Sequence, residues 1–270
     1  MPSLDAGSPL FHLVGMTQLV VWAIPIVLFV AQLLLISVGY RHRRAPHDRS
    51  SNEAIAPMVT AGLSLMGLIL AFSFYDAARR LDANRKTILD EANAIESVYM
   101  SVQLVEAPAR DRMEETLRQY VDTRVHAYTT YEERMGLEEY ERQFAGSSTV
   151  FRDLWSAAIE ATPDGTNRSI ILGALNTASA AAAARTLAMN THLPPAVDLY
   201  LVGTVLVGAL LVGSVLAQGN GPQWFYRVVF AATLSCTILT IVDMEYPRLA
   251  APPLLRDADT VLMELRKSMK

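Results

Sequence analysis

The sequence predicts an all-α membrane protein with four transmembrane helices and a helical bundle inserted between the second and the third. Three observations lead to this prediction. Hydrophobic residues make up 51% of the chain, which is unusual for a soluble domain. Four segments are long and apolar enough to cross a bilayer. The charged region between the second and third of these segments has helical spacing and no strand alternation.

Each of the four segments holds the roughly 20 apolar residues that a helix needs to cross the hydrocarbon core. They are Leu13–Tyr40, Ala54–Tyr75, Pro195–Gln218 and Trp224–Tyr246. A glycine-rich turn joins the last two, so we expect them to form a hairpin. Small residues recur at four-residue spacing, which predicts close helix packing within the chain or between subunits. These residues are Gly67 and Ala71 in the second segment, and Ala209, Gly213 and Ala217 in the third.

The second segment continues as a charged helix without an intervening proline or glycine. This pattern predicts one continuous helix that carries Phe72 within the membrane and Glu91 outside it. Steps of four residues along this helix define one stripe on a slowly turning face. The stripe consists of Ser64, Leu68, Phe72, Asp76 and Arg80.

Such a stripe could line a gated pore if several copies of the chain surrounded an axis. Apolar rings can gate by dewetting, and charged rings can select ions. On periodicity alone, contact of Leu68 and Phe72 with lipid or with a neighbouring helix is the simpler interpretation, because membrane helices commonly carry bulky residues at this spacing.

The chain therefore divides into four predicted parts. Residues 13–75 form the first transmembrane pair, 76–194 the extramembrane bundle, 195–246 the second transmembrane hairpin, and 247–270 an amphipathic helix. We expect this last helix to dock on the bundle or on the membrane surface. Within the bundle, Gly146 and the serines after it predict that a helix begins at Ser147.

Charged residues at a membrane edge need partners. If the second and fourth segments pack together, Arg79 or Arg80 can pair with Asp243, and Glu245 ends the same crossing. Glu91 lies beside an apolar helix face, so it is either a hydrogen-bonding acid inside the bundle or a residue that bends out to the surface. These residues are predicted structural ion-pair candidates.

The composition argues against several other functions. The single cysteine, Cys236, excludes an intrachain disulfide, and the five histidines have no metal-ligand spacing. The sequence has no nucleophile–base arrangement, paired carboxylates or phosphate-binding glycine loop. We therefore expect no enzyme activity, catalytic residue, metal site or cofactor. A net charge of −4 without a long basic stretch argues against nucleic-acid binding.

Basic residues favour the cytoplasmic side of a membrane, but here they give two answers. The arginines that follow the first segment place the bundle outside. The larger number of basic residues that flank the bundle and follow the fourth segment places it inside. The first group is Arg41, Arg43, Arg44 and Arg49, and Arg227 counts on the same side. The second group is Arg79, Arg80, Arg85, Lys86, Arg185, Arg248, Arg256, Arg266 and Lys267.

Four stretches resemble a family of bacterial membrane proteins called bestrophin-like. They are Gly67–Arg80, Glu91–Tyr99, a proline followed by an arginine-rich helix that reaches Tyr120 and Val121, and the acid-x-x-x-Pro pattern that runs from Asp243 to Pro247. A looser similarity links them to the bestrophins, which are pentameric ion channels. In bestrophins the second membrane helix lines the pore and continues into a cytoplasmic helical domain.

The resemblance implies a multi-pass protein of the bacterial inner membrane, with lipid as its surroundings and a cytoplasmic bundle. It also implies a homo-oligomer, a pentamer if the likeness to bestrophins holds, with ions as permeants. Carried over to this chain, the narrow part of the pore falls on Ser64, Leu68 and Phe72. Ser64 departs from the family's all-apolar pattern, which weakens the case for a tight hydrophobic gate.

Two functions follow from these patterns. The first is an oligomeric ion channel with the second transmembrane helix lining the pore. The alternative is a membrane-anchored sensory or interaction module that conducts no ions. The number of subunits separates them, because a pore needs several copies around an axis, whereas the module needs only one or two.

Overall fold

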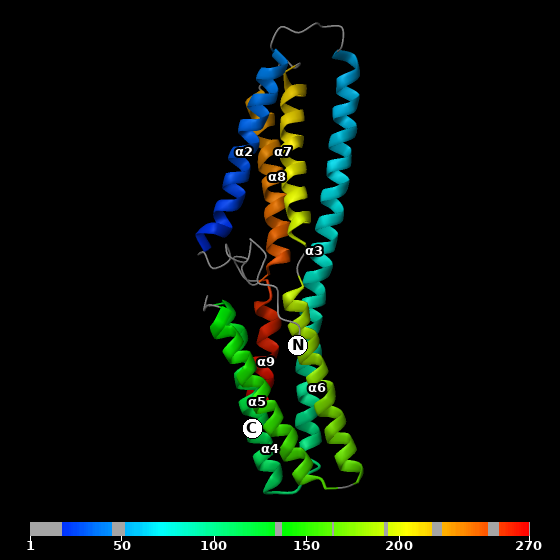
Figure 1. Ribbon diagram of the computed structural model, residues 1–270, viewed down its shortest axis with the longest axis vertical. Coiled ribbons are helices and arrows are strands. Elements are labelled where there is room, and N and C mark those ends of the chain that lie inside the picture. Colours follow the sequence, from blue (N-terminus) through cyan, green and yellow to red (C-terminus); the bar gives the residue numbers. More distant parts are fainter. Residues whose placement is uncertain are drawn as a thin grey trace. The chain divides into compact units, whose positions relative to one another are not determined.

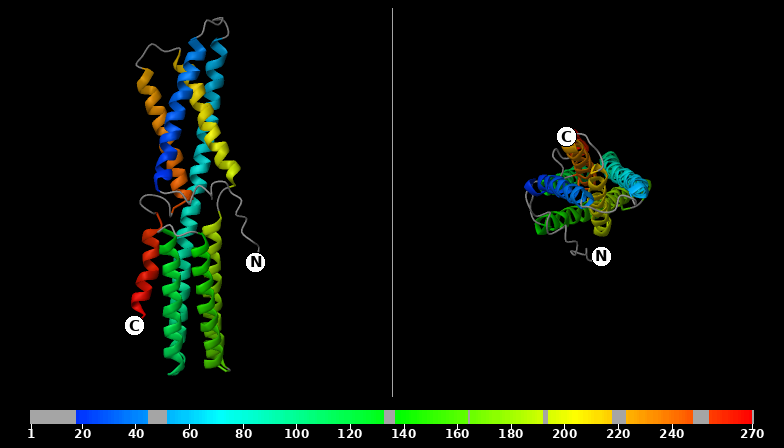
Figure 2. Two further views of the ribbon diagram at one scale, coloured as in Figure 1. Left: turned by 60° about the vertical axis from the view of Figure 1, so that its left-hand side comes forward. Right: turned by 90° about the horizontal axis from the view of Figure 1, so that it is seen from above.

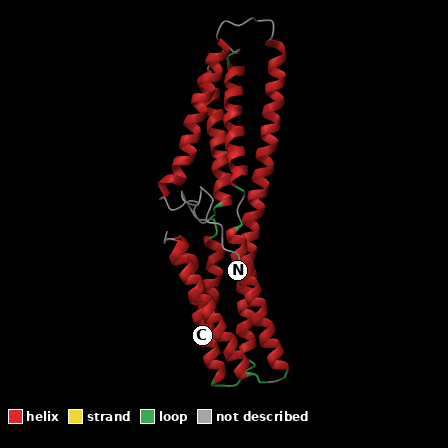
Figure 3. Cartoon of the chain, in the orientation of Figure 1, coloured by secondary structure: helices red, strands yellow, loops and turns green. Residues whose placement is uncertain are grey.

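The computed structural model describes residues 18–44, 52–132, 137–163, 165–191, 194–217, 223–247 and 254–269. Every regular element within these ranges is an α-helix (Figure 3). In chain order the helices are α2 (Gln18–Arg44), α3 (Asn52–Val102), α4 (Ala109–Glu132), α5 (Leu137–Ala161), α6 (Thr166–Asn190), α7 (Pro195–Leu216), α8 (Gln223–Glu245) and α9 (Arg256–Ser268) (Figure 1). The predicted all-α class agrees with the described part of the chain.

The chain divides into two compact units. The apolar unit comprises residues 1–79 and 192–246, and the polar unit comprises residues 80–191 and 247–270. Helices α2, α7 and α8 belong to the apolar unit, whereas α4, α5, α6 and α9 belong to the polar unit. Helix α3 contributes its first half to the apolar unit and its second half to the polar unit.

Helix α3 is continuous over 51 residues. Its sequence explains the continuity, because the single proline, Pro57, lies near the first turn and no glycine follows Gly67. Residues 75–85, in which the composition changes from apolar to charged, are helical throughout. The predicted continuous helix is therefore confirmed.

Within the described ranges, five helices are long and apolar enough to span a membrane, one more than the sequence predicted. The qualifying ranges are Ala23–Arg43, Pro57–Val102, Thr166–Met189, Ala196–Leu216 and Gln223–Glu245. The additional helix is α6, which owes its apolar character to a run of alanines between Ala178 and Ala184. Helix α6 carries Arg185 in its second half.

In the apolar unit, α2, α7 and α8 lie side by side (Figures 1 and 2). Helices α2 and α7 approach so closely that two glycines are needed. A Cβ atom at Gly213 would collide with the backbone of Ile36, and one at Gly39 would collide with the carbonyl of Leu210. Ala209, one turn before Gly213, is fully buried. The small-residue spacing of α7 thus serves close packing within the chain, as lipid provides no hydrophobic drive between helices.

The apolar half of α3 packs on α7 through Met66, whose sulfur lies against Gly208. Leu70 belongs to the same buried cluster, together with Leu201 and Val205. Gly67 of α3 makes no such close contact, because a Cβ at this position would meet no atom within 4 Å. That surface of α3 is open within this chain.

The polar unit has a hydrophobic core of its own. The apolar face of α3 supplies Ile95 and Val98, and α4, α5 and α6 contribute residues with no more than 1% exposure. These include Leu117 and Val121 from α4, Leu154 and Ala158 from α5, and Ile171 and Leu175 from α6. The apolar residues at helical spacing in this part of the sequence thus lie in a shared core.

The predicted helix start at Ser147 is wrong. Helix α5 begins at Leu137 and runs through Gly146 without interruption. A glycine inside a helix costs about 1 kcal/mol relative to alanine, which packing can offset. Ser147 is buried at 2% exposure, so it lies in the helix interior instead of capping its first turn.

Helix α9 docks on the polar unit, which was one of its two predicted sites. Leu262 and Met269 belong to the core, with exposures of 1% and 3%. Arg266 donates two hydrogen bonds to the Asp122 carboxylate on α4, from Nε at 2.7 Å and Nη2 at 2.9 Å. The hydrogen bond to Asp122 raises the pKa of Arg266.

Candidate functional site

The apolar half of α3 has one buried face and one open face. Val59, Met66, Leu70 and Ala77 are buried against the rest of the apolar unit. At about 100° of rotation per residue, Leu68 lies roughly opposite this buried face, and its exposed fraction is 51%. The open face is therefore available to lipid or to another copy of the chain.

The predicted stripe follows this open face. Ser64, Phe72 and Asp76 are exposed, and the exposed fraction of Phe72 reaches 63%. The Ser64 hydroxyl donates a hydrogen bond of 2.9 Å to the Thr60 carbonyl, one turn earlier. Arg80, the last residue of the stripe, belongs to the polar unit and is half-buried.

Tyr75 was not singled out from the sequence, although it lies on the same face. Its exposed fraction is 60%, and the Arg79 guanidinium stands 6.0 Å above its ring. Arg79 and Asp243 are not joined by an ion pair in the described part of the chain. Asp243 is half-buried near the end of α8, and Glu245 is buried at 6% exposure.

The second notable feature is a buried charge cluster in the polar unit. Glu91 has no exposed surface, and Arg124 and Arg185 are each 1% exposed. Arg124 donates from Nε to Glu91 Oε1 at 2.7 Å, and Arg185 donates from Nη1 to Glu91 Oε2 at 2.8 Å. One carboxylate thus binds two guanidinium groups and ties α3 to α4 and to α6.

The two arginine partners could not be identified from the sequence. They lie 33 and 94 residues from Glu91 along the chain, so no local spacing links them to it. One signal was present, since both arginines interrupt otherwise apolar helix faces. Arg124 follows Leu117, Tyr120 and Val121, and Arg185 follows the alanine run of α6. A buried basic residue nearly always has an acidic partner.

Tyr120 packs beside this cluster, with its ring centroid 5.2 Å from that of Phe151. Burial raises the pKa of the Tyr120 phenol from 10.0 to about 12, with Glu91 adding to the rise and Arg124 and Arg185 opposing it. The raised pKa stabilises the fold below pH 10, and this contribution is lost as the pH rises from 10 towards 12.

We expect Tyr120 to ionise only near pH 12 in the folded protein. The difference between the phenolate absorbance of the wild-type protein and that of Tyr120→Phe isolates this one group. Tyr120→Phe keeps the ring in place and should weaken the loss of stability between pH 10 and 12. Ionisation of Tyr120 at its ordinary pKa with the helices intact would contradict the expectation.

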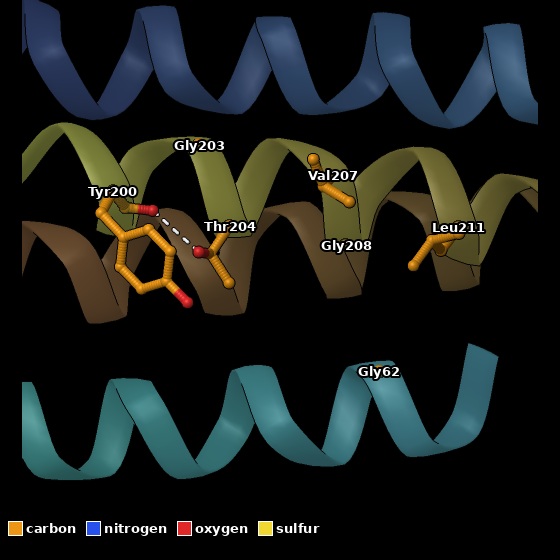
Figure 4. Close-up of a pocket in the computed structure, with 7 residues that line it drawn as sticks. All are labelled: Gly62, Tyr200, Gly203, Thr204, Val207, Gly208 and Leu211. Carbon is orange, nitrogen blue, oxygen red and sulfur yellow. Dashed lines mark hydrogen bonds between the residues drawn. The ribbon is translucent and has the colours of Figure 1, made fainter. Parts of the chain in front are cut away.

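A groove of about 360 Å³ lies between α3 and α7 in the apolar unit (Figure 4). Its lining is mostly small or apolar: Gly62, Tyr200, Gly203, Thr204, Val207, Gly208 and Leu211. The Thr204 hydroxyl donates to the Tyr200 carbonyl at 2.8 Å, so it is already used within the helix. The residues that line the groove include no charged side chain.

No group of three metal-ligating side chains occurs among the described residues. Cys236, the single cysteine, is exposed on α8 within this chain. The described side chains thus supply an open helix face, a buried charge cluster and an apolar groove.

The fold and the apolar helices define a multi-pass, all-helical membrane protein. A family model described as the Bestrophin-like domain matches residues 26–247. The chain belongs to the Bestrophin-like family. No curated protein matches it.

Solved structures share this fold. A point mutant of a bacterial Bestrophin homolog from Klebsiella pneumoniae is similar at a TM-score of 0.67 and 14% identity, covering 92% of this chain and 98% of that one. A second structure of that homolog, phased with zinc, gives a TM-score of 0.64 at 14% identity and covers 90% and 98%. A crystal structure described only as a membrane protein gives 0.66 at 14% identity and covers 92% and 96%.

Proposed function

We propose that this protein is one subunit of an oligomeric ion channel whose pore is lined by α3. The observation that carries the proposal is the open face of α3, on which Ser64, Leu68, Phe72 and Asp76 are exposed within the chain. The face combines two bulky apolar side chains with a hydroxyl before them and a carboxylate after them. Apolar side chains around an axis can gate by dewetting, and a ring of carboxylates can favour cations.

The position of Asp76 favours a pore over a lipid-facing surface. An ionised carboxylate is costly in hydrocarbon, so charged side chains of membrane helices usually face water or protein. Asp76 is exposed and lies within one helical turn of Phe72 and of Arg79. In an assembly with α3 at its axis, Asp76 would face the aqueous end of the pore.

Four helices cross the membrane in this proposal, namely α2, the first half of α3, α7 and α8. Helix α6 is excluded although it is apolar enough, because Arg185 binds Glu91 in the core of the polar unit. The second half of α3 is excluded for the same reason. Residues 80–191 of the polar unit are then a bundle inserted between the second and third crossings.

The assembly we propose is a pentamer in the bacterial inner membrane, in keeping with the Bestrophin-like family and with the resemblance to bestrophin channels. The polar unit lies in the cytoplasm, since most basic residues flank its crossings. Arg79, Asp243, Glu245 and Glu91 act in this proposal as structural charges. Ions are the permeants, and lipid and further copies of the chain are the partners.

The test measures passive ion flux through the protein reconstituted in liposomes. Phe72→Ala should raise the flux several-fold, because it removes the bulkiest apolar side chain of the stripe. Phe74→Ala is the matched control, since Phe74 lies two residues on and points about 200° away around the helix. Its exposed fraction is 40% against 63% for Phe72, and its removal should leave the flux near the wild-type value.

The number of subunits is measured on the same preparation in nanodiscs. Five copies with flux above that of empty liposomes support the channel. One or two copies, with no flux from either the wild-type protein or Phe72→Ala, would contradict the channel. That result would favour the alternative, a membrane-anchored interaction module.

A further inference from the structure

Helices α2 and α8 pack antiparallel in a regular register. The Gln32 amide donates to the Ser235 hydroxyl at 3.0 Å, and Ile36 and Ala231 lie in one buried cluster. One turn further along, the Arg227 guanidinium stacks on the Tyr40 ring at 4.1 Å. Every step of four residues along α2 is matched by a step of four back along α8.

The next step of this register brings the basic end of α2 beside the first turn of α8. Arg43, one turn beyond Tyr40 on α2, therefore lies at the level of Gln223 and Trp224. The Arg227 Nη2 atom donates to Gln223 Oε1 at 3.4 Å, a long hydrogen bond. Arg43 and Arg227, from different helices, are therefore at the same end of the apolar unit.

Both guanidinium groups retain unused hydrogen-bonding capacity. The Nη2 atom of Arg43 and the Nε atom of Arg227 are buried and have no hydrogen-bond partner among the residues that the structure describes. A buried donor without an acceptor costs about 1–3 kcal/mol, and more when it is charged. An anionic acceptor bound here would remove this cost.

The described acidic side chains of the apolar unit lie at its other end. Asp198 is in the first turn of α7, Asp243 and Glu245 end α8, and Asp76 lies where α3 leaves the unit. Figure 1 shows these helix ends opposite the ends at which α2 stops and α8 starts. The acceptor for Arg43 and Arg227 is therefore not one of these carboxylates.

Aromatic residues place this end at the membrane surface. Trp224, Phe225 and Tyr226 are 69%, 50% and 55% exposed in the first turn of α8. Tryptophan and tyrosine rings gather where the hydrocarbon meets the lipid headgroups. At such an interface the two arginines would lie at the depth of the phosphates.

We infer that Arg43 and Arg227 form a binding site for the phosphate of an anionic phospholipid headgroup. A guanidinium group binds phosphate oxygens in a bidentate manner, and two of them match a phosphodiester better than one. Tyr40 holds Arg227 in place by stacking.

Native mass spectrometry of the purified full-length protein tests the site, with phosphatidylglycerol and phosphatidylcholine as probes. We expect phosphatidylglycerol to remain bound about tenfold more than phosphatidylcholine. Arg227→Gln and Arg43→Gln should each reduce the bound phosphatidylglycerol by about tenfold, the effect of one charged hydrogen bond. Arg227→Lys keeps the charge without the planar stack and should give an intermediate loss.

Arg79→Gln is the matched control, because Arg79 also stands over a tyrosine ring but lies at the other end of the apolar unit. It should leave lipid binding unchanged. Equal retention of the two lipids by the wild-type protein would overturn the site even if the variants failed to fold. An equal loss of bound phosphatidylglycerol in Arg79→Gln would also overturn the site. Displacement of the lipid by millimolar inorganic phosphate would do the same. The measurement does not depend on ion flux, so it stands apart from the proposed channel.

Discussion

Replacing Glu91 by glutamine is expected to destabilise the polar unit by about 3–5 kcal/mol, the usual effect of removing one partner from a buried ion pair. Glu91→Gln keeps the size and shape of the side chain but leaves Arg124 and Arg185 buried without their carboxylate. Hydrogen–deuterium exchange of peptides from α4 and α6 reports the effect, because these are the helices that Glu91 ties to α3.

An exposed ion pair provides the control. Glu115 accepts from Arg118 at 3.0 Å, but its side chain is 59% exposed, so Glu115→Gln should change stability by only about 0–1 kcal/mol. A triple variant that replaces Glu91 by leucine and both arginines by methionine should recover much of the loss, since it removes the buried charges together. Unchanged exchange in Glu91→Gln would show that the cluster contributes little to the stability of the bundle.

Gly213→Ala is expected to destabilise the apolar unit by about 1–3 kcal/mol, the range for overpacking in a tight core. The upper end is expected, because the new methyl group meets the backbone of Ile36 on α2. A backbone cannot rotate away as a side chain can, so the two helices must separate. Thermal unfolding of the purified protein in detergent measures the change.

Gly203→Ala is a control on the same helix. A Cβ at Gly203 would meet no atom within 4 Å, and alanine is favoured over glycine inside a helix by about 0.5–1 kcal/mol. Both substitutions replace glycine by alanine, and we expect the changes in stability that they cause to have opposite signs. A shift of the same sign and size in both would mean that α2 and α7 are not closely packed at Gly213.

The parts of the fold that depend on local pattern could be predicted from the sequence. The continuity of α3 follows from the absence of helix-breaking residues after Gly67, and the core of the polar unit follows from apolar residues at helical spacing, such as Ile95 and Leu117. The fate of Gly146 could not be predicted, because a glycine can end a helix or lie inside one. Only the burial of Ser147 in the assembled bundle decides between these outcomes.

The candidate site also has a part that the sequence predicts and a part that only the three-dimensional structure shows. The stripe from Ser64 to Arg80 can be found from a spacing of four, but that spacing does not show which helix faces are covered. The structure adds that Leu68 lies opposite the buried face of α3. The choice of Arg124 and Arg185 as partners of Glu91 depends on three-dimensional packing over long sequence separations, and an interpretation confined to one helix at a time misses it.

The exposure of Cys236 has a practical consequence. It is the single thiol in the chain, and it lies on the surface of α8 within the apolar unit. A nitroxide or fluorophore can therefore be attached to the natural protein without first removing other cysteines. Quenching of such a label by lipid-soluble and water-soluble reagents would report its depth in the bilayer, and a loss of accessibility on assembly would show whether α8 lies at a contact between subunits.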